Sequence, residues 1–71
     1  MGILKRANSK QEVFDFRCYD AVQAAADPIS AGDVALIVRE NAFEVRRVLE
    51  RLFRQKAISR VRVGGVWRYF V

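Results

Sequence analysis

Histidine is absent from the 71-residue chain, and cysteine and proline each occur once, as Cys18 and Pro28. A single cysteine excludes an intramolecular disulfide. With one cysteine and no histidine, the chain is poor in the sulfur and nitrogen ligands that zinc prefers. It also lacks a glycine-rich phosphate-binding loop, and no pair of acids has an evident cause for a raised pKa. The sequence therefore predicts no enzyme, no cofactor, no metal site and no small-molecule ligand.

Long apolar runs are missing as well. No segment approaches the roughly 18 consecutive apolar residues of a membrane span. The first six residues have neither the apolar core of a signal peptide nor the serine or threonine of a myristoylation motif. We therefore expect a soluble, cytoplasmic protein with no membrane partner. No linker-like segment divides the chain, so we expect a flexible basic arm at residues 1–8 and one domain at residues 9–71.

Positive charge is concentrated in the second half of the chain. Residues 1–40 contain five basic and six acidic side chains, a net charge of −1, whereas residues 41–71 contain eight basic and two acidic ones, a net charge of +6. Seven of these eight are arginines, whose planar guanidinium group suits phosphates and guanine edges. A solvated basic surface without a partner would have the same composition, but this asymmetry is typical of small nucleic-acid-binding domains.

The first predicted helix covers residues 10–26. Ser9 followed by Glu12 fits a capping box, and Pro28 disfavours a helical residue before it, which ends the helix. One side of this helix is spaced as a core stripe should be. Its members are Phe14, Cys18, Ala21, Val22 and Ala25.

Three side chains of this helix carry specific expectations. We interpret Cys18 as a small core residue rather than a reactive thiol, because it lies on the apolar stripe. Phe16 and Tyr19 fall on the opposite face. There they either cover the N-terminal arm or form a surface for self-association.

Two further helices follow an extended segment at Ile29. Ser30 is the predicted N-cap of the first of them, which ends near residue 39 or 40. Asn41 is the predicted N-cap of the next, over residues 42–55. The expected core residues of the two helices are Val34, Ile37, Val38, Val45, Val48, Leu49 and Leu52.

In residues 58–71 the pattern of residue types changes to an alternation with a period of two, which is typical of β-strands. Two β-prone runs flank Gly64 and Gly65, and a primed hairpin turn needs the positive φ that glycine adopts easily. The predicted cross-strand pairs are Val63–Val66, Arg62–Trp67 and Arg60–Tyr69. An isolated hairpin is marginally stable, so this one either packs on the helices or pairs with the segment at Ile29.

The order helix, short strand, helix, helix, strand, strand resembles the winged helix-turn-helix family of DNA-binding proteins over about residues 14–71. In that family a small residue and an apolar residue lie ten apart across the turn, as Ala35 and Val45 do here. The resemblance implies an α+β fold with three helices and a C-terminal two-stranded β-hairpin, the wing. Lys56 departs from the family, which usually ends the third helix with a left-handed glycine.

The resemblance also implies a binding site. The third helix is expected in the DNA major groove, with the wing on the backbone or in the minor groove. The predicted contacts of the helix are Phe43, Arg46, Arg47, Glu50, Arg51 and Arg54. Those of the wing are Arg60, Arg62 and Arg68. Lys5, Arg6 and Ser30 are expected at the DNA backbone.

The roles of single residues stay open at this point. Arg46 or Arg47 can bind guanine in a bidentate manner, or each can contact a phosphate. Phe43 can meet a thymine methyl group. Glu50 can accept a hydrogen bond from cytosine, or it can hold a neighbouring arginine in place. Trp67 is expected to pack the hairpin rather than to stack on a base.

The expected function is that of a small transcriptional regulator of the prokaryotic, phage or plasmid type. It would bind double-stranded DNA as a homodimer or a cooperative assembly, because one such domain makes few base contacts. Two alternatives are a winged-helix module that binds a protein, and a non-specific or architectural binder of nucleic acid.

Overall fold

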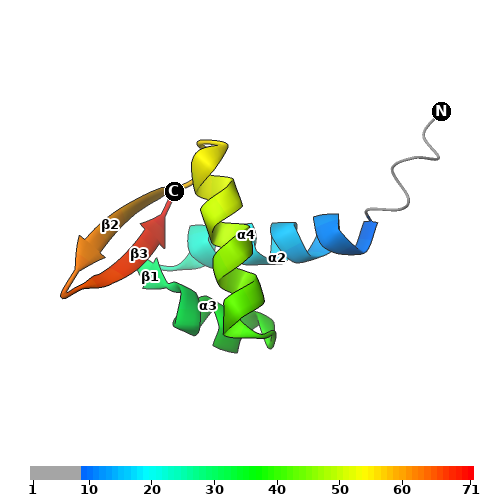
Figure 1. The fold of residues 1–71 in the computed structure, drawn as a ribbon, viewed down its shortest axis with the longest axis horizontal. Helices are drawn as coiled ribbons and strands as arrows, with labels where there is room; N and C mark the ends of the chain where they lie inside the picture. The colour runs from blue at the N-terminus through cyan, green and yellow to red at the C-terminus, as the bar shows by residue number, and fades with distance from the viewer. Residues whose placement is uncertain (1–8) are drawn as a thin grey trace.

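The computed structural model describes residues 9–71, which form three helices and a three-stranded antiparallel sheet (Figure 1). The elements are α2 (Ser9–Ala24), β1 (Ile29–Ser30), α3 (Ala31–Val38), α4 (Ala42–Arg54), β2 (Ser59–Val63) and β3 (Val66–Phe70). In Figure 1, α4 crosses α2, α3 lies at the N-terminal end of α4, and the β2–β3 hairpin projects away from the helices. The predicted α+β class and order of elements are confirmed. No helix of the described chain is long and apolar enough to cross a membrane.

The end of α2 comes two residues earlier than predicted, at Ala24. Ala25 donates its N–H to the carbonyl of Val22 at 3.3 Å, which tightens the last turn before the chain leaves the helix. Pro28 then disfavours the helical region for the residue before it. The core stripe of α2 is otherwise as predicted, with Ala25 half-buried at its end.

Ser30 caps α3, as predicted. Its Oγ accepts a hydrogen bond from the backbone N–H of Asp33 at 3.2 Å. The buried residues of α3 are Val34, Ala35 and Val38. Ile37 is 58% exposed, so its predicted place in the core is wrong. The buried arc is centred on Val38, with Val34 and Ala35 on either side of it, and Ile37 lies beyond its edge.

α4 begins at the predicted cap and buries the predicted face. Asn41 Oδ1 accepts the backbone N–H groups of Phe43 at 2.7 Å and Glu44 at 3.3 Å, which satisfies two of the free amides of the first turn. The buried side chains of α4 are Val45, Val48, Leu49 and Leu52. The apolar side of α4 is therefore buried in the core, and the opposite side is exposed.

The end of α4 is a left-handed turn without glycine. Lys56 has a φ of 64° and donates its N–H to the carbonyl of Phe53 at 3.0 Å. Ala57 donates to the carbonyl of Leu52 at 2.9 Å, which completes a Schellman motif. Arg39, after α3, adopts a similar φ of 60°. Both residues have a Cβ that makes this conformation unfavourable.

Replacing Lys56 by glycine is expected to stabilise the fold. Glycine adopts positive φ without the clash of a Cβ, so the free energy of unfolding should rise by about 1 kcal/mol. For a domain of this size, that gain raises Tm by about 4–8 °C in a thermal melt followed by circular dichroism. Lys56→Ala is the matched control, because it removes the same charge and keeps the Cβ. An equal gain in both variants would show that charge, not backbone conformation, is responsible.

The sheet has three strands, in the order β1–β3–β2. All three predicted cross-strand pairs of the hairpin are confirmed, and Gly64 and Gly65 have φ of 59° and 81°. The predicted two-stranded sheet is wrong in its strand count, because Ile29 pairs with Tyr69 and Ser30 with Arg68. The structure contains both supports foreseen for the hairpin, the pairing with residue 29 and packing on the helices through buried Tyr69. The third strand supplies backbone hydrogen-bond partners to a hairpin that would be only marginally stable alone.

The core is one cluster to which all three helices and the sheet region contribute. Its fully buried side chains are Leu49, Val34, Val45 and Cys18. Burial, followed by the negative charge of Asp15, raises the pKa of the Cys18 thiol from 9.0 to about 11. The thiol is therefore protonated at neutral pH and enclosed, which agrees with the interpretation of Cys18 as a core residue.

Candidate nucleic-acid interface

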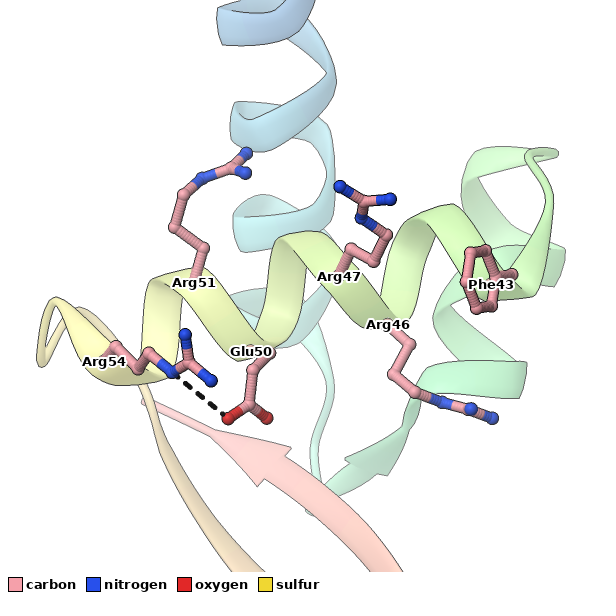
Figure 2. A pocket seen from close by; sticks show the side chains of 6 residues that line it. All are labelled: Phe43, Arg46, Arg47, Glu50, Arg51 and Arg54. Atoms are coloured by element: carbon pink, nitrogen blue, oxygen red, sulfur yellow. Dashed lines mark ion pairs between the residues drawn. The ribbon is translucent and has the colours of Figure 1, made fainter.

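The exposed side of α4 forms an open pocket. Figure 2 shows the six side chains that line it. They are Phe43, Arg46, Arg47, Glu50, Arg51 and Arg54. These are the six residues of this helix that the sequence singled out, so the structure brings the whole predicted set onto one surface.

Arg46 and Arg47 stand at the N-terminal half of this surface. They leave α4 in opposite directions, Arg47 toward the α2 side and Arg46 away from it (Figure 2). Both are exposed, and within residues 9–71 neither takes part in an ion pair or a side-chain hydrogen bond. Phe43 lies beside them and is 59% exposed. Two guanidinium groups and one aromatic ring are thus presented to solvent.

Glu50 holds two arginines. Its Oε1 accepts a hydrogen bond from Arg60 Nη1 at 2.9 Å, and its Oε2 lies 3.5 Å from Arg54 Nε, one helical turn away. Of the two roles left open for Glu50, the structure therefore contains the one in which the carboxylate holds neighbouring arginines. Its negative charge is compensated where it would otherwise repel a polyanion.

Arg60 extends from β2 into a cluster that we call the Arg60 stack, formed by Phe53, Arg60 and Trp67. The Arg60 Cζ lies 4.0 Å from the centre of the Phe53 ring and 4.1 Å from that of the Trp67 ring. Such cation–π contacts contribute about 0.5–2 kcal/mol, and more where water is excluded. Arg62 Cζ lies 5.1 Å from the centre of the Trp67 ring. Trp67 therefore packs the hairpin, as expected.

Arg51 joins α4 to α2. Its Nη2 donates to Asp15 Oδ1 at 2.7 Å, and Figure 2 shows the side chain extending toward α2. Arg17, also on α2, donates a hydrogen bond to the backbone carbonyl of Val38, and its Nη1 lies 3.8 Å from Glu40 Oε2. The predicted DNA contact Arg51 thus has an intramolecular partner that holds two helices together.

A second open pocket lies between the first turn of α3, the middle of α4 and the hairpin. Arg46 and Glu50 border both pockets, so the two form one continuous surface. Ser30 and Trp67 lie along the second one. Ser30, a predicted backbone contact, is half-buried, and its Oγ is used to cap α3.

The two aromatic residues predicted for self-association differ in position. Phe16 is 64% exposed, as expected, whereas Tyr19 is half-buried and packs against the core. The predicted exposure of Tyr19 is therefore wrong, and Phe16 alone of the pair presents a large surface. Lys5 and Arg6, the predicted arm contacts, lie outside the described residues, and so does the capping side chain of Ser9.

Phe53 and Asp15 are the site residues that the sequence did not reveal. Each acts across the fold, Phe53 on Arg60 and Asp15 on Arg51, which is 36 residues away. One signal was available for the Arg60 stack. Since the predicted register sets Arg60 opposite Tyr69, a buried Tyr69 implies that Arg60 points to the helix side of the sheet.

Other types of site find little support in the part of the chain that is described. Residues 9–71 contain no group of three or more histidine, cysteine, aspartate or glutamate side chains that could hold a metal ion. Comparison with known proteins adds no relative: no family model, no curated protein and no solved structure matches the chain.

Proposed function

We propose that the chain is a winged helix-turn-helix protein that binds double-stranded DNA and acts as a small transcriptional regulator. Helices α3 and α4 are joined by a tight turn at residues 39–41, which is the connection that a helix-turn-helix requires. The β2–β3 hairpin follows as the wing, and β1 completes its sheet. This arrangement supports an assignment of α4 as the recognition helix.

The observation that carries the proposal is the pair Arg46 and Arg47. In a helix-turn-helix the N-terminal part of the second helix reaches the base edges of the major groove. Arg46 and Arg47 are exposed at that part of α4, and no acid within residues 9–71 pairs with them. Phe43 offers an apolar contact one turn earlier. We assign these three side chains to the major groove.

Other exposed cations on this surface are assigned to phosphates. Arg54 has a side chain that is 75% exposed at the C-terminal end of α4, and Arg62 is exposed near the tip of the wing. Arg68 lies half-buried on the opposite face of the hairpin from Arg62, so it is not part of this surface and we assign it no phosphate there. Phosphate contacts fix the register of the protein on DNA and supply most of the salt-dependent affinity. Lys5 and Arg6 are proposed to add backbone contacts, and Ser30 to place the start of α3 near a phosphate.

Binding is proposed to involve more than one copy. A single domain of this size covers few base pairs, so useful specificity requires a homodimer or cooperative binding to repeated half-sites. Exposed Phe16 is our candidate for a contact between copies.

A salt titration tests the binding itself. The affinity for a fluorescent random-sequence duplex is measured between 50 and 200 mM salt. If four phosphates are neutralised, log K should fall against log salt concentration with a slope of about −3.6. An affinity that does not change with salt, or no binding at low salt, would contradict the proposal.

Selection from random duplexes then separates the three possible uses of such a surface. An enriched sequence motif supports the regulator. Salt-dependent binding without a motif supports the non-specific or architectural binder instead. Absence of binding at low salt leaves the protein-interaction module as the remaining interpretation of the fold.

A further inference from the structure

We infer that Arg60 is a positioning residue that locks the wing onto α4 and does not itself contact DNA. This inference rests on the proposed function and specifies how its site is held together. Arg60 is one of the three wing arginines predicted to contact DNA, and here we remove it from that set. Glu50 and the Arg60 stack together form the contact between the wing and α4, which we call the lock. Glu50 therefore does not contact a base.

The Arg60 guanidinium is largely enclosed. Its Cζ lies over the rings of Phe53 and Trp67, 4.0 and 4.1 Å from their centres. Its edge is occupied by Glu50, whose Oε1 is 2.9 Å from Nη1. Only 20% of the side chain is exposed. A DNA phosphate that bound Nη1 would have to displace the Glu50 carboxylate, and most of the rest of the side chain is covered by its neighbours.

The wing needs such a lock because its sheet partner covers only part of it. β1 pairs with Arg68 and Tyr69 alone, so the half of the hairpin nearer the turn has no third strand beside it. In that half Arg62, Val63 and Val66 are all exposed. The Arg60 stack reaches this region through Trp67, whose ring centre also lies 5.1 Å from Arg62 Cζ. The lock therefore fixes the position of Arg62 relative to Arg46 and Arg47.

The charges of the lock cancel. Arg60 and Glu50 contribute +1 and −1, and the neutral pair lies on the continuous surface between α4 and the wing. Replacing both residues by neutral ones of similar shape keeps the net charge of +5. Methionine can lie between two aromatic rings with favourable sulfur contacts, and glutamine keeps the size of glutamate. The double variant Glu50→Gln/Arg60→Met thus retains a packed neutral lock.

Three variants test the inference by duplex titration, well below their Tm so that each is fully folded. Arg60→Met alone should bind about tenfold more weakly, because the wing is loosened and Glu50 loses its closer partner beside the DNA. The double variant should return to within about threefold of the original chain. Arg62→Met is the matched control on the same strand and the same face. It should lower the salt slope by about 0.9, which the double variant should not do.

The result that overturns the inference is a double variant that binds as weakly as Arg60→Met, with a salt slope reduced as in Arg62→Met. Arg60 would then be a phosphate contact. An unchanged affinity of folded Arg60→Met would also overturn it, since Arg60 would then serve stability alone.

A measurement without DNA separates this inference from the proposed function. In free Arg60→Met, the backbone amides of residues 62–67 should exchange with solvent at least several times faster, while those in the middle of α4 keep their rates. Unchanged hairpin exchange would refute the lock even if DNA binding holds. If the original chain binds no DNA, the proposed function fails, and this exchange experiment still tests the lock.

Discussion

Binding to duplex DNA is expected to weaken by at least about thirtyfold when Arg46 and Arg47 are both replaced by alanine. Each bidentate contact between an arginine and a base contributes about 1–3 kcal/mol of discrimination, and two such losses sum to about 2–6 kcal/mol, which is about 30-fold to 10⁴-fold in affinity. The fold should be retained, because both side chains are exposed and have no ion-pair partner in the described chain. The measurement is a titration of the selected DNA sequence, with circular dichroism to verify folding.

A change in net charge alone would also weaken binding, so the double variant needs a charge control. Lys10→Gln removes one exposed charge from α2, and Lys10 is not among the residues that line the α4 pocket. It should change the affinity less than threefold at 150 mM salt, where the Debye length is about 8 Å. Each single arginine variant should lower the affinity by at least about fivefold. Equal losses in Lys10→Gln and in the single arginine variants would mean that α4 attracts DNA only as part of a diffuse positive field.

Replacing Leu49 by alanine is expected to remove most of the stability of the domain. Leu49 is fully buried at the centre of the cluster, and deleting a buried leucine side chain costs about 2–5 kcal/mol. A chain of this size has about 4–10 kcal/mol in total, at 0.05–0.15 kcal/mol per residue. Urea denaturation followed by circular dichroism should therefore show unfolding at a much lower urea concentration, or a chain that is already partly unfolded in buffer.

Leu36→Ala is the control for this prediction. The chemical change is identical and also occurs within a helix, but Leu36 is 78% exposed on α3. Its effect on the free energy of unfolding should stay within about 0.5 kcal/mol. If the two variants lost similar stability, the packing of α3 and α4 described above would be wrong.

The parts of this fold that the sequence predicted are those fixed by local chemistry. Asn41 and Ser30 cap helices through atoms two or three residues away. The turn at Gly64 and Gly65 sets the whole hairpin register, because a two-residue turn leaves one way to pair the flanking strands. The apolar face of α4 follows from its period alone.

The errors and omissions involve contacts between distant segments. The period of α3 did not separate Ala35 from Ile37, because which arc of a helix is buried depends on the neighbours that cover it. The partners of Arg60 and Arg51 belong to other elements, so no spacing within one helix or strand reveals them. For the candidate site, residue type and face were therefore predictable. The sequence did not show which arginines have an ion-pair or stacking partner within the molecule.

The place of β2 at the edge of the sheet has a consequence for solubility. An exposed edge strand offers its free backbone groups to a second copy of itself, and Val61 and Val63 would favour such pairing. Arg62 opposes it. In the antiparallel register that sets Val61 opposite Val63 of the other copy, Arg62 lies opposite Arg62, and like charges directly opposite are destabilising. The charge on this edge strand thus opposes edge-to-edge aggregation of the chain.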